Sequence, residues 1–322
     1  MLNKKEKYLK YFKAEIDEID NYILNNINFM ENIFEEALNK LLKGGGKRIR
    51  SILLLKFAAF NNNGEKHPDK TISLAAAIEI LHMATLVHDD IVDRSLIRRG
   101  EPSALADFGE ESAIFIGDYF LSKAYRLLIN NAGQESLRLI NQKLPAICSG
   151  EMQEFKNRYN SNITVNTYLK QIRRKSALLF AIATYIGGSE SGLSQAFVNK
   201  AYRFGVKLGM AFQIQDDIED FIGGKELNKP VLQDIKNGIY SLPLIYYFRK
   251  SSSQLSALEL KNLDAEELIK ELNKYNIIKE VTLLRNRYYQ KAKNELLQLP
   301  ACSAKKDLEF ILDLLGYDND IC

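Results

Sequence analysis

Apolar residues recur along most of the chain at intervals of three and four positions, and this spacing restricts the fold more than any other feature of the sequence. Ile16, Ile19, Ile23 and Ile27 illustrate the pattern, which places apolar side chains on one face of an α-helix. Residues 71–99 contain neither glycine nor proline, so a long helix can run there without a break. Because no alternating β-branched run lies between tight turns, we expect no strand and an all-α fold.

Short segments rich in glycine, proline, asparagine or serine interrupt the helical pattern. They are Gly44–Gly46, Asn61–Pro68, Gly100–Pro102, Gly187–Gly188, Gly223–Gly224 and Ser251–Ser253. None looks like a domain linker, and we find no clear internal repeat. We therefore predict a single domain over residues 1–322, a bundle of roughly ten or more helices packed against one another.

The charge balance restricts the class of partner. The chain has 44 Lys and Arg residues against 41 Asp and Glu residues, a formal net charge of +3. A general nucleic-acid binder usually carries a strong basic excess or a basic stripe, so we expect no nucleic-acid partner.

The cysteines and the apolar runs predict a cytoplasmic protein. Cys148, Cys302 and Cys322 are far apart and form no CxxC pair, which argues against a zinc site and a disulfide framework and favours reduced thiols. No apolar region follows the basic N-terminus to make a secretory signal. The longest apolar run, Ala177–Ile186, has about half of the ~20 residues that a transmembrane helix needs, so we expect no transmembrane segment.

The first candidate site is an aspartate cluster in the segment HDDIVDR. Asp89 and Asp93 lie about 40° apart on a helix, because each residue advances the helix by about 100°. His82, seven residues before Asp89, shares that face, whereas His88 points about 120° away from it. In the sequence, Asp90 lies between Asp89 and Asp93. We expect the His82 side to be the working face and His88 to be a packing or supporting residue.

The second candidate site is the segment FQIQDDIED. Gln213, Asp216, Asp217 and Asp220 follow the spacing i, i+3, i+4, i+7, so all four fall on one helix face. Gly209 lies just before them on the same side, and the missing side chain would let another element or a ligand approach closely.

Both aspartate clusters are embedded in apolar sequence, which argues against the alternative that they are solvated helix faces. The apolar neighbours are Leu86, Val87, Ile91, Val92, Phe212, Ile214, Ile218 and Phe221. Carboxylates on a mostly buried helix need cations to stay ionised. Oxygen ligands without a histidine or cysteine partner favour a hard ion such as Mg²⁺, which usually binds a few carboxylates together with substrate phosphates. Two such clusters across a cleft would form a diphosphate–metal site.

Three basic clusters could complete that site. They are Lys47, Arg48 and Arg50 in GGGKRIR, Arg98 and Arg99 before Gly100, and Arg173, Arg174 and Lys175. The glycine run does not match the Walker A pattern, so it is not a P-loop. Any one cluster is more often a solvated face than a site, but arginine forks suit phosphate oxygens.

Together these motifs resemble those of the trans-isoprenyl diphosphate synthases, also called polyprenyl synthetases. The matching segments are GGGKRIR (44–50), DDIVD (89–93), RRG (98–100), GDYFLSKA (117–124), RKSALL (174–179), FQIQDDIED (212–220) and NKPVLQDIKNGIYSLPLIY (228–246). The order and spacing agree over about residues 40–250. The resemblance implies the isoprenoid synthase fold, an all-α bundle around a deep central cavity.

The resemblance also implies a Mg²⁺-dependent prenyl transfer and a role for each motif. Both aspartate motifs would bind the metal and act in catalysis, through Asp89, Asp90, Asp93, Asp216, Asp217 and Asp220. The diphosphate of isopentenyl diphosphate would contact Lys47, Arg50, His82 and Arg99. The allylic diphosphate would contact Arg98, Lys175, Gln213 and Lys229, and Lys175 would stabilise charge on the departing diphosphate.

In this family the side chains just before the first aspartate motif set the length of the product. Ala84 and Thr85 are both small, which implies an open tunnel and a product of roughly six or more isoprene units. Helix geometry places Thr85 about 40° from Asp89 and Ala84 about 140° away, so periodicity favours Thr85. The segment GEMQEFKNRYN (150–160) also resembles bacterial long-chain members, especially heptaprenyl-type synthases.

Two other functions are compatible with parts of this pattern. A class I terpene cyclase would share the fold and the first aspartate motif, but it usually has a different second metal motif and needs no second set of basic residues. Some long-chain bacterial synthases are catalytic subunits that are inactive without a small partner subunit. The resemblance therefore implies a homodimer or a heterodimer with a small subunit.

Overall fold

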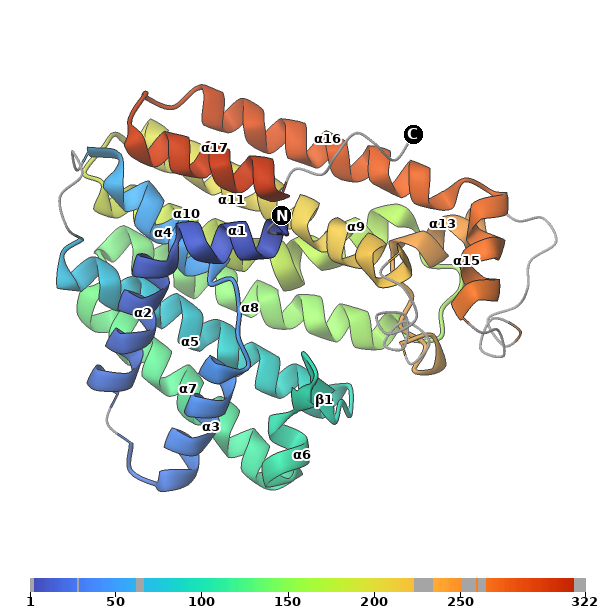
Figure 1. Cartoon of the computed structure of the whole chain (residues 1–322), viewed down its shortest axis with the longest axis horizontal. Coiled ribbons are helices and arrows are strands. Elements are labelled where there is room, and N and C mark those ends of the chain that lie inside the picture. Colours follow the sequence, from blue (N-terminus) through green and yellow to red (C-terminus); the bar gives the residue numbers. More distant parts are fainter. Residues whose placement is uncertain are drawn as a thin grey trace. The chain divides into compact units, whose positions relative to one another are not determined.

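The computed structural model describes residues 3–27, 29–61, 67–222, 234–250, 259 and 265–315. α-Helices make up most of these residues (Figure 1), and the predicted all-α fold is confirmed. The chain divides into two compact units, each assembled from separate stretches of sequence. The single domain over residues 1–322 stays a prediction.

Unit 1 comprises Met1–Ile140, Ile182–Tyr202 and Leu299–Leu314. Its elements are α1 (Lys4–Tyr11), α2 (Lys13–Asn26), α3 (Asn32–Lys43), α4 (Ile49–Ala58), the 3₁₀ turn Ala59–Asn61, α5 (Asp69–Val92), β1 (Ile97–Arg98), β2 (Glu101–Pro102), α6 (Ala104–Phe108), α7 (Glu110–Asn131) and most of α17 (Ser303–Leu315).

Unit 2 comprises Asn141–Ala181, Arg203–Gln298 and Leu315–Cys322. Its own elements are α9 (Val165–Ile172), the π-helical turn η2 (Arg173–Ala177), α13 (Leu242–Lys250), α15 (Ala265–Lys274) and α16 (Ile277–Leu297). Three further helices contribute residues to both units: α8 (Gln134–Asn157), α10 (Leu178–Glu190) and α11 (Gln195–Ile222).

Helix α5 lies in the core of unit 1, where it runs beside α7 (Figure 1). Every residue from 71 to 81 is buried, because this stretch is apolar or small on nearly all sides of the helix, and its one charged residue, Glu79, is paired with Arg48. Within the described ranges, α5 alone is long and apolar enough to span a membrane, but 78% of that apolar window is buried inside the protein. Length and composition therefore give only weak support for a membrane span.

Beyond its exposed first two residues, Asp69 and Lys70, the next polar side chains of α5 that reach solvent come near its end. His82, Thr85, His88 and Asp89 are half-buried, whereas Ala84 and Asp90 are buried. A rigid core helix thus carries its functional candidates on its last three turns, where burial of the preceding residues fixes the direction of the helix.

The predicted break at Gly187–Gly188 is wrong, because α10 continues through both glycines. The two glycines are needed for close packing instead. A Cβ at Gly187 would lie 2.2 Å from the carbonyl oxygen of Leu54, and one at Gly188 would lie 3.1 Å from Cβ of Ala201. A helix tolerates glycine when another backbone must approach this closely.

The prediction that no strand occurs is also wrong in one place. β1 and β2 form a two-stranded antiparallel hairpin in which Arg98 pairs with Glu101. The two residues of its turn, Arg99 and Gly100, have φ of 55° and 85°, as a tight hairpin turn requires. The strands have only two residues each, too few for an alternating pattern to be visible in the sequence.

Candidate active site

The first aspartate motif lies at the C-terminal end of α5. Asp89 and Asp90 belong to its last turn, and Asp93 follows the helix with its N–H donating to the Asp89 carbonyl at 2.9 Å. Asp89 and Asp93 are half-buried, whereas Asp90 is 1% exposed. The motif is therefore split between two partly accessible carboxylates and one that points into the protein.

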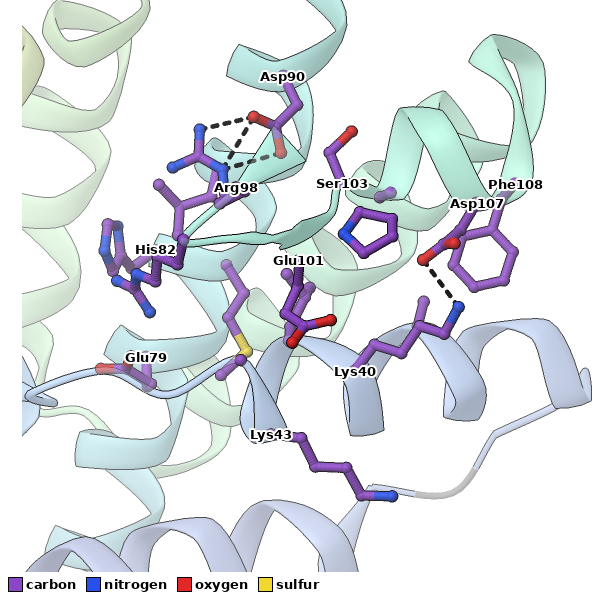
Figure 2. Close-up of a pocket in the computed structure, with 18 of the residues that line it drawn as sticks. Lys40, Lys43, Glu79, His82, Asp90, Arg98, Glu101, Ser103, Asp107 and Phe108 are labelled. Carbon is purple, nitrogen blue, oxygen red and sulfur yellow. Dashed lines mark hydrogen bonds and ion pairs between the residues drawn. The ribbon is translucent and has the colours of Figure 1, made fainter. Parts of the chain in front are cut away.

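Arg98 from the hairpin neutralises the buried carboxylate of Asp90. Its Nε lies 2.9 Å from both carboxylate oxygens, and its Nη2 lies 2.7 Å from Oδ1 (Figure 2). The sequence assigned Asp90 to the metal and Arg98 to the allylic diphosphate. In this structure the two residues bind each other.

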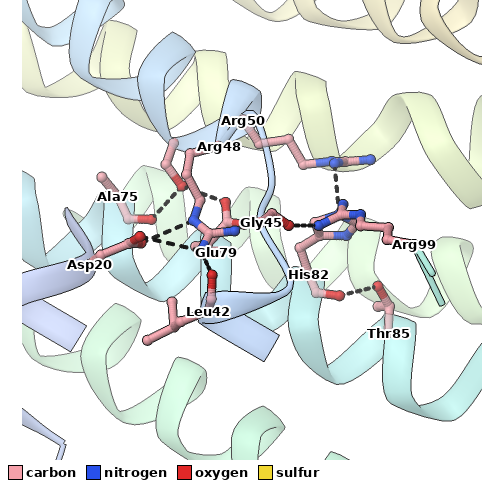
Figure 3. Close-up of polar contacts among 11 residues, drawn as sticks. Asp20, Leu42, Gly45, Arg48, Arg50, Ala75, Glu79, His82, Thr85 and Arg99 are labelled. Carbon is pink, nitrogen blue, oxygen red and sulfur yellow. Dashed lines mark hydrogen bonds and ion pairs between the residues drawn. The ribbon is translucent and has the colours of Figure 1, made fainter. Parts of the chain in front are cut away.

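The GGGKRIR segment forms the turn between α3 and α4, and it presents Arg50 to α5. Nη1 of Arg50 lies 3.0 Å from Nε2 of His82 (Figure 3). Because arginine can only donate, Nε2 of His82 must accept and its proton must be on Nδ1. Burial, and then the positive charge of Arg50, hold the pKa of His82 well below 6.5, so this histidine is neutral at physiological pH.

Arg99 lies on the other side of the glycine turn. Its guanidinium donates to the Gly45 carbonyl oxygen, and Lys47 is half-buried in the same turn. The structure thus gathers Arg50, His82 and Arg99, three of the four residues assigned to isopentenyl diphosphate, around one turn of chain in unit 1. Arg48, which the sequence groups with Lys47 and Arg50, differs from them because its side chain is buried and forms ion pairs.

A cavity of about 490 Å³ lies beside this cluster in unit 1 (Figure 2). Its lining combines basic and acidic groups of the motifs with apolar residues of α3, α5 and α6: Ala37, Lys40, Leu41, Lys43, Gly44, Arg48, Glu79, His82, Met83, Leu86, Asp90, Arg98, Arg99, Glu101, Pro102, Ser103, Ala104, Asp107 and Phe108. This volume is within the range of small-molecule sites. His82, Asp90, Arg98 and Arg99 therefore border space that a ligand can occupy.

His88 and the two chain-length candidates have distinct surroundings. The ring of His88 covers Gly117, where a Cβ would lie 2.3 Å from Nε2, and Nε2 lies 3.3 Å from Oδ1 of Asp118. Ala84 is 1% exposed. Thr85 is half-buried, and its hydroxyl donates to the His82 carbonyl at 2.8 Å. Of the two small residues, only Thr85 has an accessible side chain.

The second aspartate motif lies on α11 in unit 2, and its middle residue is anchored there. Asp217 is 4% exposed and accepts three hydrogen bonds, from the Tyr168 hydroxyl, from the Leu242 N–H at 3.1 Å and from Nε2 of Gln213 at 3.2 Å. Burial raises the pKa of Asp217 to about 6, although these hydrogen bonds oppose the rise. Gln213 also accepts a hydrogen bond from Ser176 at 2.6 Å.

Asp216 and Asp220 are half-buried on the same helix. Burial, followed by the charges of Asp217 and Glu219, raises the pKa of Asp220 to about 7. Carboxylates grouped on one helix face, where burial opposes their charge, are the donor set that a hard divalent cation stabilises. In the part of the chain that the structure describes, no three His, Cys, Asp or Glu side chains converge to hold a metal ion by themselves. Mg²⁺ usually binds a few carboxylates together with substrate phosphates, and the half-buried Asp216 and Asp220 fit that donor set.

Lys175 lies in the π-helical turn η2 between two acidic residues of α8. Its Nζ is 2.8 Å from Oε2 of Glu151 and 2.6 Å from Oε1 of Glu154. The other oxygen of Glu154 accepts from Nε2 of Gln171 at 2.9 Å. A π-helical turn often marks a functional site, because it re-aims side chains.

Two glycines allow the segments around Lys175 to approach. A Cβ at Gly150 would lie 2.6 Å from the backbone nitrogen of Lys175, and one at Gly209 would lie 2.6 Å from Cα of Ala177. The close approach predicted at Gly209 is therefore confirmed, and the partner is a helical turn of the protein.

Sequence reasoning missed Glu151, Glu154 and Tyr168. Glu151 and Glu154 are spaced i, i+3 in a helical segment, which places them on one face, and this spacing could have drawn attention to them. Tyr168 gave no signal. Lys229 and the rest of residues 223–233 lie outside the described residues. The two aspartate motifs belong to different units, so their meeting across a cleft, and the central cavity, stay predictions.

Comparison with known proteins gives consistent matches over almost the whole chain. The family model described as polyprenyl synthetase matches residues 31–281. The heptaprenyl diphosphate synthase component 2 of Bacillus subtilis is 32% identical over 95% of this chain and 88% of its own length. A crystal structure of heptaprenyl diphosphate synthase from Staphylococcus aureus has a TM-score of 0.87 at 32% identity, covering 96% of this chain and 98% of that one.

A third match contains ligands. The crystal structure of a polyprenyl synthase from Caulobacter crescentus, complexed with calcium and isoprenyl diphosphate, has a TM-score of 0.87 at 26% identity and covers 97% of both chains.

Proposed function

The chain belongs to the polyprenyl synthetase family and is a prenyltransferase, and we propose that it adds isopentenyl diphosphate to an allylic prenyl diphosphate to make a long-chain polyprenyl diphosphate. The product length follows from the small side chains before Asp89 and from the heptaprenyl synthases among its relatives. We expect roughly six or more isoprene units, since a methyl-sized or hydroxyl side chain leaves room for an extended chain.

The observation that carries the proposal is that each aspartate motif lies beside basic residues. Arg98 contacts the first motif at Asp90. In unit 2, Lys175 lies next to Ser176, which donates to Gln213 of the second motif. This combination of acids and bases suits a diphosphate bridged by metal, because the acids bind cations and the bases bind phosphate oxygens directly.

The acids that fit Mg²⁺ best are the partly accessible ones, Asp89 and Asp93 on α5 and Asp216 and Asp220 on α11. Magnesium, when bound, supplies positive charge that makes the allylic diphosphate a better leaving group. The Caulobacter crescentus relative, whose structure is complexed with calcium and isoprenyl diphosphate, supports a divalent cation and a prenyl diphosphate as the ligands of this chain. That the two motifs share one site stays a prediction from the sequence.

The basic residues bind and orient the substrates. Arg50, His82, Arg99 and Lys47 would hold the diphosphate of isopentenyl diphosphate, with neutral His82 donating from Nδ1 to a phosphate oxygen while its Nε2 accepts from Arg50. Arg98, Lys175, Gln213 and Lys229 would hold the allylic diphosphate. In this proposal, Arg98 and Lys175 exchange their carboxylate partners for phosphate oxygens when the substrate binds.

In the reaction, the allylic C–O bond breaks and leaves an allylic cation. Lys175 stabilises the charge on the departing diphosphate. The double bond of isopentenyl diphosphate then attacks the cation, and a proton leaves to the released diphosphate, restoring an allylic product. Holding both substrates in one orientation replaces an improbable encounter in water.

We also propose that the active form is a dimer in the cytoplasm. The name of the Bacillus subtilis relative, component 2, favours a second, different subunit over a homodimer. A catalytic subunit of this kind would be inactive alone and active after its partner is added. The terpene cyclase alternative is less favoured, because the second metal motif is a second DDxxD, at Asp216 to Asp220, and a second set of basic residues, with Arg50 and Arg99, lies at the glycine turn.

The test is direct. Purified protein is incubated with Mg²⁺, labelled isopentenyl diphosphate and farnesyl diphosphate, and product lengths are read by chromatography. We expect long-chain products, either from the protein alone or after a small subunit is added. Elongation in neither condition, or a cyclic hydrocarbon from farnesyl diphosphate alone, would contradict the proposal.

A further inference from the structure

The glycine turn that presents Lys47 and Arg50 is held in place by the buried guanidinium of Arg48. We propose that Asp20 and Glu79, which bind Arg48, are positioning residues that fix this turn for isopentenyl diphosphate. The proposal rests on the proposed function, because it concerns the same substrate. Neither acid belongs to a motif of the sequence.

Arg48 is held by two acids from two helices. Its Nε lies 3.0 Å from Oδ1 of Asp20 on α2, its Nη2 lies 3.3 Å from Oδ2 of the same residue, and its Nη1 lies 3.5 Å from Oε1 of Glu79 on α5 (Figure 3). The side chain of Arg48 is 3% exposed and that of Glu79 is 5% exposed. Charged groups this deeply buried need partners, so the guanidinium is confined to one place.

Further contacts hold the pieces of this cluster. Nη2 of Arg48 donates to the Leu42 carbonyl at 3.3 Å, at the end of α3. The Ser51 hydroxyl on α4 lies 3.1 Å from Oε2 of Glu79 and 2.9 Å from the Ala75 carbonyl. One guanidinium therefore connects α2, α3 and α5 at the point where the chain turns into α4.

The backbone of the turn lies between two guanidinium groups. A Cβ at Gly46 would lie 2.6 Å from Nη1 of Arg48 and 3.0 Å from Nη1 of Arg99. Arg99 also donates to the Gly45 carbonyl. Arg48 itself has a φ of 45°, a left-handed conformation that a non-glycine residue holds only when its surroundings impose it.

The position of Arg48 sets the positions of its neighbours. Lys47 precedes it, and Arg50 follows it in the first turn of α4, which begins at Ile49. If Arg48 loses its anchors, the left-handed residue can relax, and both neighbours move with it. A displacement of about 1 Å can cost a binding group much of its effect, so the anchors should influence substrate binding without touching the substrate.

The decisive variant is Asp20→Asn, which removes the charge but preserves the shape. Asp20 is the better choice because its side chain is 26% exposed, so the variant can fold with the amide partly in water. The matched control is Asp17→Asn on the same helix, whose carboxylate pairs with Lys13 at 2.8 Å on the surface. Binding of isopentenyl diphosphate is measured by calorimetry, and KM and kcat are measured for each substrate.

We expect Asp20→Asn to weaken isopentenyl diphosphate binding and to raise its KM about tenfold, with KM for farnesyl diphosphate changed by less than about twofold. Asp17→Asn should match wild type in both. Arg48→Lys keeps the positive charge but removes the planar guanidinium that contacts both acids, so it should reproduce the effect of Asp20→Asn. The double variant should be no weaker than either single one, because both remove the same contact.

Other results overturn the inference. Equal weakening of both substrates, or a lower melting temperature with unchanged KM values, would make the cluster purely structural. Wild-type binding retained in Asp20→Asn would remove its positioning role while leaving the proposed function intact. Wild-type protein that binds no isopentenyl diphosphate would overturn the proposed function and the substrate assigned to this turn.

Discussion

Arg98 and Asp90 form a three-contact ion pair, in which Nε of the arginine lies 2.9 Å from both carboxylate oxygens and Nη2 lies 2.7 Å from one of them. Asp90 is 1% exposed and the side chain of Arg98 is 29% exposed. The pair connects the end of α5 to the hairpin, so a residue assigned to metal binding also holds the fold.

Replacing Asp90 by Ala should therefore lower stability as well as activity. We expect the free energy of unfolding to fall by about 2–4 kcal/mol, since the variant leaves a partly buried arginine without its partner. Urea unfolding measures the change. Glu101→Ala is the control, because Glu101 pairs with Arg98 in the hairpin register but is exposed. Equal stability of the two variants would contradict a structural role for the pair.

The pKa of His82 provides a test of the cluster around Arg50. Burial lowers this pKa well below 6.5, and the charge of Arg50 lowers it further. In Arg50→Gln the pKa of His82 should rise, because a repelling cation is gone. His67 is an internal control, since burial and Lys56 lower its pKa without Arg50. NMR titration of the imidazole signals measures both, and a pKa of His82 that is unchanged in the variant would contradict the contact.

The same shift has a consequence for stability against pH. The unfolded chain takes up a proton on this histidine near pH 6.5, whereas the folded protein takes it up only at lower pH. The unfolded state therefore binds more protons in this window, and stability falls as pH drops below 6.5. In His82→Gln that part of the pH dependence should be absent from unfolding curves measured at a series of pH values.

The sequence predicted the helices better than the tertiary contacts between them. The helical fold and the faces of His82, Asp89 and Asp216 follow from a period of 3.6 residues, which is a local property. The partners of these residues, such as Arg98 for Asp90 and Tyr168 for Asp217, depend on tertiary contacts between segments up to 49 residues apart, which no local pattern specifies.

Gly187 also shows that a local sequence pattern does not specify tertiary contacts. Glycine usually interrupts a helix, so the sequence predicted a break. Contact with the Leu54 backbone requires glycine there instead, and tertiary packing overrides the local preference.

The close approach at Gly150 should be necessary for the position of Lys175. In Gly150→Ala the new Cβ would lie 2.6 Å from the Lys175 backbone nitrogen, so the π-helical turn must shift. We expect kcat to fall about tenfold or more, although alanine is the better helix former. Gly133→Ala is the control, because nothing lies within 4 Å of its Cβ position. Equal kcat in both variants would exclude a positioning effect at Gly150.

Removing the amine of Lys175 tests its proposed charge stabilisation. Lys175→Gln should lower kcat by about 10²–10³-fold, as the loss of one group that stabilises developing charge does in other enzymes. KM for isopentenyl diphosphate should change little, because that substrate is assigned to other residues. Single-turnover kinetics with farnesyl diphosphate measures the effect. A normal single-turnover rate would assign Lys175 to the structure of α8 through Glu151 and Glu154 alone.

Thr85 and Ala84 should respond differently to the same enlargement, although the sequence placed both among the chain-length residues. The Thr85 side chain is half-buried and lies about 40° from Asp89 around the helix, so phenylalanine there should block the growing product and shorten it. Ala84 is 1% exposed, and phenylalanine there would overpack the core at a cost of about 1–3 kcal/mol. Product chromatography and thermal unfolding distinguish the two. Long products from a stable Thr85→Phe protein would contradict the assignment, and so would shortened products from Ala84→Phe with normal stability.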